Sequence, residues 1–385
     1  MKPLDGVRVI DLSRVLAGPY ATMLLADMGA EVIKVEEPGK GDDTRAWPAF
    51  AGGESTYFMS VNRGKKSLTL DLKSEAGKTV LRKLVAGADV LVENFRPGVM
   101  DRLGFGWDVV HARWPKLVYA AASGFGQTGP LRERPAFDMV VQAMGGIMSL
   151  TGYPDGPPAR VGVSIGDIVA GLFLVIGIHA ALIRRAETGG GALVDVAMLD
   201  CQLAILENAF TTHLVTGAVP DRLGTRHPNI APFQAFEAGD GRLLVVCAGH
   251  DVQFAAFCTA IGRSDMLADP RWATPDDRRV NADALVAEAA RELRRRPAAE
   301  WLAVLESVGV PCAPVNTVAE AVRTPQAAAR NMILEIADPV IGRLFVAGNP
   351  IKLSGMPDDA THRPPPELDA DRAAILAWLE SRRTR

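Results

Sequence analysis

Short apolar runs alternate with longer segments of helical pattern in the first third of the chain. The runs at residues 7–12 and 31–36 have the length of strands, and residues 20–28 between them carry apolar positions at helical spacing, closed by Gly29. This order predicts a strand, a helix and a second strand parallel to the first.

The alternation continues well beyond this unit. A helix is predicted over residues 74–86, and further strands at residues 67–72, 89–93, 117–122 and 193–198. Strands separated by segments of this length predict an α/β fold, in which a mostly parallel, Rossmann-like sheet carries helices on both faces.

One apolar run is unusually long. Residues Ile168 to Ile183 are interrupted only by His179, and Asp167 and Arg184 bracket them. The run is shorter than the roughly 20 residues that span a bilayer. We therefore predict a core helix of a soluble protein, with no membrane as a partner.

The pattern changes after Asp221. Apolar residues at 233–236 and 243–246 flank a Gly-Asp-Gly turn and predict a β-hairpin, and residues 281–308 have a helical pattern. These elements predict a small α+β domain over residues 225–325.

The rest of the chain, residues 1–224 completed by 326–385, is predicted to form a large α/β domain. A chain of 385 residues is long enough for two such domains. The terminal segment, residues 369–382, has apolar residues at helical spacing and is expected to pack against the first part of the large domain.

Composition and charge exclude several classes of protein. With 42 Lys and Arg against 45 Asp and Glu, the net charge is −3 without an extended basic block, so nucleic acid is not expected as a partner. The four cysteines have no CxxC spacing and the six histidines are scattered, so no metal site is predicted. Reduced thiols and an N-terminus without a signal-peptide pattern favour a cytoplasmic protein.

The turn after the first predicted strand is where dinucleotide-binding enzymes carry GxGxxG. Residues 13–19 read Ser-Arg-Val-Leu-Ala-Gly-Pro instead, and Pro19 has no N–H to offer a phosphate. A Walker A sequence is also absent. These departures disfavour a hydride-transferring Rossmann enzyme.

Two aspartates, Asp167 and Asp138, each open an apolar helical segment. A carboxylate at a helix N-terminus can cap free N–H groups and is held ionised by the helix dipole. The same features suit a carboxylate nucleophile, which must stay deprotonated while partly shielded from water. For Asp167 both roles stay open; Gly166 and Gly171 beside it are expected to let a ligand approach closely.

Polar side chains also follow the predicted strand at residues 89–93. Open α/β sheets bind ligands at the carboxyl ends of their strands. Here Asn94 offers an amide, Phe95 a stacking face and Arg96 a partner for phosphate. This segment is therefore a candidate ligand-binding site.

These segments, in this order, resemble the class III CoA-transferase family, which includes formyl-CoA transferase, carnitine CoA-transferase and the α-methylacyl-CoA racemases. The resemblance covers essentially the whole chain, and the ordered set of segments is highly specific. The matching segments are residues 3–12, 16–19, 29–36, 61–67, 92–98, 123–130 and 166–167.

The resemblance implies a CoA thioester substrate, an interlocked homodimer and a nucleophilic aspartate, which corresponds to Asp167. Its carboxylate would attack the donor thioester to give an acyl-aspartyl anhydride, and the CoA thiolate would return to form an aspartyl-CoA thioester. Each step trades one activated acyl bond for another, so no ATP is needed. By the same resemblance, the CoA-binding residues are Val15, Ala17, Leu70, Lys73, Asn94, Phe95, Arg96 and Arg102.

The chain departs from the family pattern at two places. Racemase members carry a histidine base at the position of Phe137, and a phenylalanine cannot abstract a proton. The glycine-rich loop of formyl-CoA transferase corresponds to residues 247–251, which contain few glycines. The first departure disfavours a racemase, and the second disfavours oxalate and formyl-CoA as substrates.

Four segments look like family members that use succinyl-CoA or related donors, namely residues 14–19, 41–45, 54–57 and 224–227. A dicarboxylate needs a cation for its distal carboxylate, and Arg45 or Arg226 is expected to supply it. Leu16, Phe137 and Asp138 are further candidates for substrate contacts.

We therefore predict a CoA-transferase that moves CoA from succinyl-CoA or another dicarboxyl-CoA to a small carboxylic acid. An α-methylacyl-CoA racemase or epimerase is the alternative enzyme. A non-catalytic CoA-binding protein, in which Asp167 only caps a helix, is the second alternative.

Overall fold

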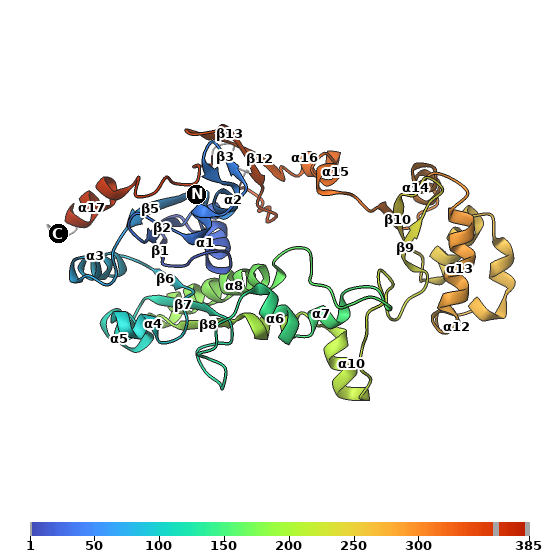
Figure 1. Cartoon of the computed structure of the whole chain (residues 1–385), viewed down its shortest axis with the longest axis horizontal. Helices are drawn as coiled ribbons and strands as arrows, with labels where there is room; N and C mark the ends of the chain where they lie inside the picture. Colours follow the sequence, from blue (N-terminus) through green and yellow to red (C-terminus); the bar gives the residue numbers. More distant parts are fainter. Residues whose placement is uncertain (1, 357–361, 382–385) are drawn as a thin grey trace. The chain divides into compact units, whose positions relative to one another are not determined.

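The structure is a computed structural model that describes residues 2–356 and 362–381 (Figure 1). The chain divides into two compact units. The first consists of Met1–Met148, Arg160–Ala218 and Pro325–Arg385, and the second of Ser149–Ala159 and Val219–Thr324.

A six-stranded sheet forms the centre of the first unit, in the order β5-β2-β1-β6-β7-β8, and every neighbouring pair is parallel. The chain builds outward from β1 in one direction and from β6 in the other, so the topological switch point lies between these two strands. The strands are β1 (Arg8–Asp11), β2 (Glu31–Glu36), β5 (Lys65–Thr69), β6 (Val90–Glu93), β7 (Val118–Ser123) and β8 (Leu193–Ala197).

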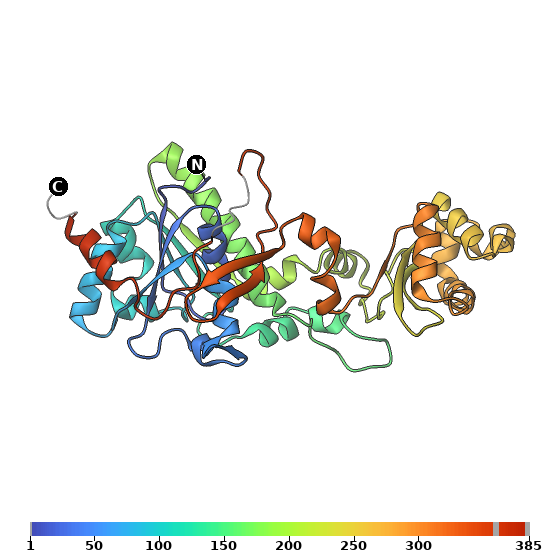
Figure 2. The ribbon, with the colours of Figure 1, turned by 90° about the horizontal axis from the view of Figure 1, so that it is seen from above.

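Successive strand residues point to opposite faces of the sheet. Val9 and Val32 share one apolar core with α1 (Ala17–Asp27) and α8 (Ile165–Thr188). Ile10 and Ile33 share another with α3 (Glu75–Val85), α5 (Trp107–Arg113) and the terminal helix α17 (Arg372–Ser381). The ribbon shows helices on both faces (Figure 1, Figure 2), which confirms the predicted Rossmann-like α/β fold.

Shorter elements complete the first unit. They include two antiparallel pairs, β3 with β4 and β12 with β13. The bounds of the shorter elements are β3 (Phe50–Ala51), β4 (Glu54–Ser55), α2 (Thr56–Asn62), α4 (Val99–Leu103), α6 (Asp138–Met144), α9 (Met198–Ala204), α10 (Asn208–Thr216), α16 (Pro325–Ala329), β12 (Ile333–Asp338) and β13 (Gly342–Ala347). The boundary between the two units falls within α7 (Ile147–Leu150).

The long apolar run lies in α8, which extends beyond the predicted helix at both ends. By length and composition α8 could cross a membrane, yet 44% of its most apolar stretch is buried. Ala170, Leu174 and Ile178 are fully buried, and the latter two pack in the core that α8 shares with α1 and the sheet. The prediction of a core helix is confirmed, and the helix is a partly buried one.

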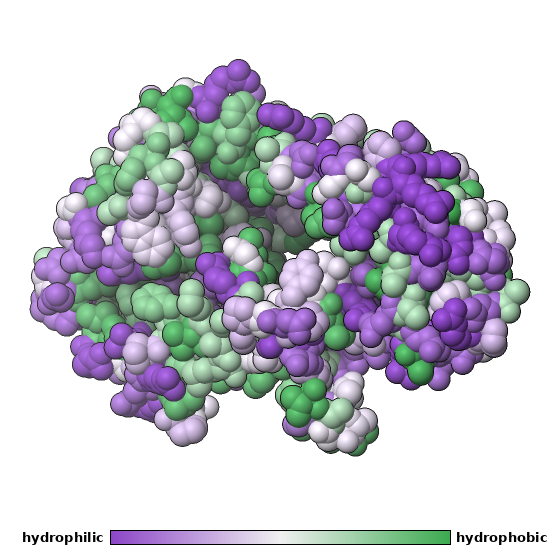
Figure 3. Space-filling model, turned by 45° about the vertical axis from the view of Figure 1, so that its right-hand side comes forward, coloured by the Kyte–Doolittle hydropathy of each residue, from purple (hydrophilic) through white to green (hydrophobic). Residues whose placement is uncertain are grey.

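The second unit contains a three-stranded antiparallel sheet in the order β11-β10-β9. Its hairpin, β9 (Phe233–Glu237) with β10 (Leu243–Cys247), confirms the predicted one. Figure 3 shows hydrophilic residues over much of the visible surface of this unit. The remaining elements are α11 (Asp251–Ala260), α12 (Pro275–Val280), α13 (Ala282–Leu293), α14 (Ala298–Ser307), β11 (Cys312–Pro314) and α15 (Val318–Ala321).

Candidate active site

Two cavities lie in the first unit where residues follow β1 and β6, at the switch point of the sheet. One has a volume of about 180 Å³ and is lined by Asp167, and the other has a volume of about 270 Å³. Arg14 and Phe95 line both, so the cavities adjoin. We refer to them as the Asp167 cavity and the outer cavity.

Most of the residues predicted to bind CoA line these cavities. Leu70 and Lys73 line the outer cavity together with Phe95. The Asp167 cavity is lined by Val15, Ala17, Asn94, Phe95, Arg96 and Phe137. The structure therefore brings together residues from five separate segments of the sequence.

Asp167 is the third residue of α8 and does not cap it. Ser164 occupies the N-cap position, and no described residue donates a hydrogen bond to the Asp167 carboxylate. Burial, and secondarily the negative charge of Asp138, raise the pKa of Asp167 to about 7. Asp167 is therefore not the capping carboxylate that was one of its two predicted roles, and burial together with the charge of Asp138 favours its protonated form.

Asp138 caps α8 although it belongs to α6. Its carboxylate accepts hydrogen bonds from the backbone N–H of Gly166 and from Nε2 of Gln142, both at 2.8 Å. Gln142 in turn accepts the N–H of Val161 through Oε1 at 2.9 Å. These bonds hold Asp138 in place beside the N-terminus of the helix that carries Asp167.

Gly166 and Gly171 serve helix packing. A Cβ on Gly166 would lie 2.7 Å from the side chain of Val141, and a Cβ on Gly171 would lie 2.7 Å from the carbonyl oxygen of Ala17. Both distances are too short for real contacts. The expectation that these glycines make room for a ligand is wrong, because neighbouring helices fill that space.

The segment after β6 is fixed by its own side chains. Asn94 accepts the N–H of Arg14 and donates to its carbonyl oxygen, both at 2.8 Å, so its amide clamps the loop after β1. Glu93 accepts the N–H of Phe95 at 2.7 Å, and burial raises the pKa of Glu93 to about 8. These bonds set the position of Phe95 between the two cavities.

Three arginines line the Asp167 cavity: Arg14, Arg96 and Arg134. Arg14 lies 3.8 Å from a Glu37 carboxylate oxygen, the long limit of an ion pair. No described residue forms an ion pair or side-chain hydrogen bond with the guanidinium of Arg96 or Arg134. Two cations are thus free to meet an anionic ligand.

Sequence reasoning did not assign Arg14 or Arg134 to the site. Arg14 could have been found, because it stands three residues after β1 at the switch point, where ligands bind. Arg134 lies over the ring of Phe125 in a loop before α6, and nothing local to its sequence shows which way that loop runs.

Arg45 does not line either cavity. Its guanidinium makes two hydrogen bonds to the Glu36 carboxylate, at 2.7 and 2.8 Å, and lies 3.7 Å above the ring of Phe58. A third hydrogen bond reaches the carbonyl oxygen of Pro366 at 3.0 Å. Arg45 is therefore committed to structure in this chain.

Two further predicted contacts, Leu16 and Arg102, line neither cavity. Leu16 is buried in the apolar core beside α1, and Arg102 is exposed on α4. Arg226 belongs to the second unit, where its guanidinium pairs with Asp283 at 2.6 Å.

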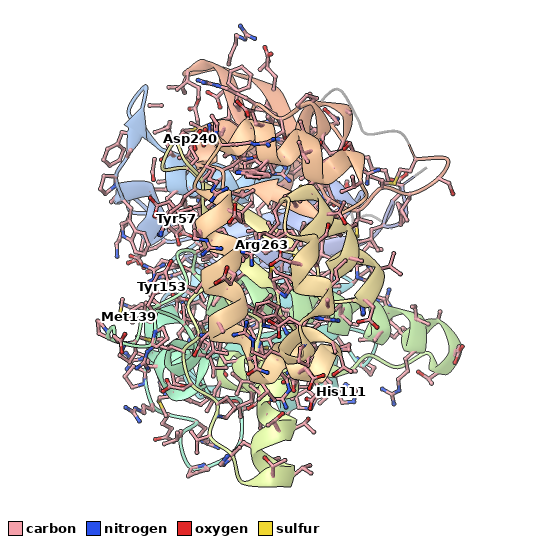
Figure 4. All side chains as sticks on the ribbon, turned by 90° about the vertical axis from the view of Figure 1, so that its right-hand side faces the viewer. Tyr57, His111, Met139, Tyr153, Asp240 and Arg263 are labelled. Carbon is pink, nitrogen blue, oxygen red and sulfur yellow. The ribbon has the colours of Figure 1, made fainter. Side chains whose placement is uncertain are left out.

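Tyr57 lies close enough to Asp167 and Asp138 for their charges to affect the pKa of its phenol. Burial, then the carboxylates of Asp167 and Asp138, raise the pKa of its phenol. Tyr57, which is labelled in Figure 4, belongs to α2. Its ring packs edge-on against that of Trp47, with 5.1 Å between the ring centroids. A phenolic hydroxyl, which stays protonated, thus accompanies the two carboxyl groups.

The arrangement suits nucleophilic chemistry by a carboxylate. Asp167 is half-buried and unpaired, its pKa is raised to about 7, and the free arginines beside it can hold anions. Among residues 2–356 and 362–381, no group of three His, Cys, Asp or Glu side chains has a metal-binding arrangement.

Comparison with known proteins places the chain in a family. The profile of CoA-transferase family III matches residues 4–372, so the chain belongs to that family. It is an enzyme that transfers CoA from an acyl-CoA substrate, as the motifs predicted.

Relatives span nearly the whole chain. The acetyl-CoA:oxalate CoA-transferase of Acetobacter aceti is 49% identical over 97% of this chain and 95% of its own length. The succinyl-CoA:glutarate CoA-transferase of Mus musculus is 39% identical over 98% of this chain and 86% of its own length. The crystal structure of a CaiB/BaiF family protein from Brucella suis has a TM-score of 0.87 at 41% identity, and covers 98% of this chain and 99% of that one.

Proposed function

We propose that Asp167 is the nucleophile of a CoA transfer between an acyl-CoA and a small dicarboxylic acid. One observation carries the proposal: among the residues lining its cavity, Asp167 is the only acidic one, and its carboxylate has no partner. A carboxylate that is spared from capping and ion pairing keeps its lone pairs for a carbonyl carbon.

The proposed reaction conserves one activated acyl bond throughout. An oxygen of Asp167 attacks the donor thioester carbonyl, and the C–S bond breaks to give the acyl-aspartyl anhydride and CoA thiolate. The thiolate then attacks the aspartyl carbonyl and releases the donor acid. Attack of the acceptor carboxylate on the aspartyl-CoA thioester, followed by return of the thiolate, yields the new acyl-CoA and frees Asp167.

CoA is assigned to the two cavities. The basic residues Lys73 and Arg14 line the outer cavity and suit phosphates, while Phe95 stands where both cavities meet. Val15 and Ala17 would border the thiol end beside Asp167. Asn94 takes part through the loop that it clamps, whereas Arg102, exposed on α4, lines neither cavity.

The acceptor class follows from the free cations and from the relatives. Oxalate and glutarate, which the two relatives are named for, are both dicarboxylic acids. Arg96 and Arg134 are free to bind a distal carboxylate, whereas Arg45 is engaged by Glu36. We therefore propose Arg96 and Arg134 for this role, which the sequence had suggested for Arg45 or Arg226.

The donor is proposed to be succinyl-CoA, because its free carboxylate can use the same cations. The relatives include enzymes named for acetyl-CoA and for succinyl-CoA, so both donors belong in the assay. A kcat/KM for succinyl-CoA at least roughly tenfold above that for acetyl-CoA supports the assignment. Equal values, or a preference for acetyl-CoA, would overturn it.

A homodimer is proposed as well, as the family resemblance implies. On α8, Ile176 and Ile183 are 62% and 67% exposed, and Leu172 and Phe173 lie on the same helix, partly exposed. Exposed apolar side chains grouped on one helix suit a protein interface. Light scattering coupled to gel filtration should give twice the mass of one chain, and a monomer would refute it.

The covalent intermediate provides the decisive test. The enzyme is incubated with succinyl-CoA or acetyl-CoA, quenched in acid, digested and examined by mass spectrometry. An acyl or CoA adduct is expected on the peptide with Asp167, and hydroxylamine should convert that residue to a hydroxamate. Asp108→Asn is the matched control, since Asp108 is an exposed first-turn aspartate of α5. No adduct with either donor would exclude the proposed nucleophile.

A further inference from the structure

The loop after β1 holds a strained residue at the wall of the Asp167 cavity. Val15 has a φ of 68°, in the left-handed region that β-branched residues rarely enter. Such a conformation persists only where the surroundings enforce it, and it is often found at functional sites. The question is which groups enforce it here.

In the loop Ser13–Val15, the backbone of each residue forms a hydrogen bond with a side chain from outside the loop. Lys34 donates through Nζ to the carbonyl oxygen of Ser13 at 2.8 Å. The N–H of Val15 points to both carboxylate oxygens of Asp42, at 3.2 and 3.3 Å. The residue between them is held by the amide clamp of Asn94 described above.

Lys34 and Asp42 form a buried ion pair with an N–O distance of 2.8 Å, and their side chains are 1% and 0% exposed. Burial alone would neutralise both groups. Each charge instead stabilises the other, so the pKa of Asp42 lies well below its usual value and the pKa of Lys34 lies above its own. Both shifts favour the ionised pair.

A buried ion pair contributes little net stability to a fold. Desolvation of two charges is costly, and apolar residues of similar size are often as stable or more stable in the same place. What an apolar pair cannot do is accept the N–H of Val15 and donate to the carbonyl of Ser13. The directional bonds, rather than the burial, distinguish this pair.

We propose that Lys34 and Asp42 are positioning residues, which hold the Ser13–Val15 loop in its strained form and so shape the wall of the Asp167 cavity against the acyl-CoA thioester. The inference rests on the proposed role of Asp167 and adds the device that orients its substrate. Displacement of a reacting group by about 1 Å can cost about 100-fold in rate.

The test removes the pair without leaving a lone buried charge. The variant Lys34→Met/Asp42→Ala is compared with the parent in steady-state CoA transfer. We expect kcat to fall by roughly 10- to 100-fold with a smaller change in the KM for acyl-CoA, because neither Lys34 nor Asp42 itself lines the outer cavity. The matched control is Arg63→Met/Asp27→Ala, which removes a buried pair of 2.6 Å that makes no contact with the loop.

A second substitution separates positioning from general damage. Glycine adopts a φ of 68° without strain, so Val15→Gly removes the need for enforcement. In the Val15→Gly background, loss of the pair should cost less than roughly threefold in kcat. An equal cost in both backgrounds, or no cost in either, would overturn the proposal.

Two safeguards keep the result decisive. If Lys34→Met/Asp42→Ala does not fold, Asn94→Ala is used in its place, with and without Val15→Gly. The loss in kcat should again be smaller in the Val15→Gly background. Hydrogen–deuterium exchange of the peptide with residues 13–17 is followed in parallel and needs no turnover. Faster exchange of this peptide on loss of the Lys34–Asp42 pair supports the positioning role, and unchanged exchange overturns it. If the parent enzyme shows no CoA transfer, only the proposed function fails, because the exchange measurement does not depend on turnover.

Discussion

Two groups of carboxylates near the carboxyl end of the sheet, one buried and one half-buried, are in opposite electrostatic states. Beneath the loop after β1, three carboxylates are each paired: Asp11 with Lys65, Glu36 with Arg45, and Asp42 with Lys34. Beside that loop, Asp138 and Asp167 stand together, and no described cation forms an ion pair with either. We call these the paired region and the unpaired region.

The difference shows how one fold can use the same side chain for structure and for chemistry. Although burial opposes ionisation, nearby cations hold the pKa of Glu36 and of Asp42 below its usual value, so these groups stay charged and occupied. Burial without a cation raises the pKa of Asp167 to about 7, which leaves a group that titrates near neutrality and is free to react.

The largest effect is expected in the unpaired region. Asp167→Asn keeps the shape of the side chain but removes the carboxylate proposed as the nucleophile, so transfer should fall by roughly 10³-fold or more. Turnover is measured with succinyl-CoA and a dicarboxylic acceptor. Asp108→Asn should retain the parental rate. More than about a tenth of the parental rate in Asp167→Asn would show that another group performs the attack.

Two arginines sharpen the comparison at the next level. Arg96 is unpaired and lines the Asp167 cavity, whereas Arg45 is paired with Glu36. Arg96→Gln should raise the KM for substrate by roughly tenfold and make it less dependent on salt. Arg45→Gln should instead lower the unfolding temperature, with a much smaller change in KM. If Arg96→Gln mainly lowered the unfolding temperature and Arg45→Gln mainly raised the KM, ion pairing would not distinguish a structural arginine from a substrate-binding one.

Much of the fold follows from local patterns. Apolar periodicity placed β2 at residues 31–36, as observed, and placed the long helix around residues 168–183 because that pattern depends only on neighbouring residues. Strand ends and motifs pointed to Asp167 and Phe95 in the same way. The resemblance to the family added the identity of the ligand.

The contacts that decide individual roles were beyond prediction. Asp138 caps the helix that begins 27 residues later at Ile165, and Arg45 lies against Glu36 because the chain turns back between them. Neither contact can be recognised in the sequence pattern, since both depend on how packed segments meet in space. Without these distances, a free arginine and a paired one look alike.

The pH dependence of transfer should respond to the second carboxylate. Attack requires ionised Asp167, so kcat/KM should rise with pH through about 7 in the parent. Asp138→Asn removes the like charge while its amide oxygen can still accept the N–H of Gly166. The rising limb should then move to lower pH, as measured between pH 5 and 9. An unmoved limb would mean that burial alone sets the titration of Asp167.

The smallest effects concern stability, where the two regions should respond to pH with opposite sign. The pKa of Asp42 is lowered in the folded state, so its contribution is present above the unfolded value of 3.8 and is lost as pH falls below it. The pKa of Asp167 is raised to about 7, so the folded state binds the extra proton and loses stability as pH rises from 3.8 through 7.

Unfolding temperatures between pH 3 and 8 separate the two contributions. Relative to the parent, Asp167→Asn should gain a few degrees at pH 8 and little at pH 4, whereas Lys34→Met/Asp42→Ala should show a shallower loss below pH 4. The same pH dependence in both variants would mean that pairing does not divide these carboxylates. Opposite dependences would show that a partner cation keeps Asp42 charged in the folded state, whereas Asp167 takes up a proton there.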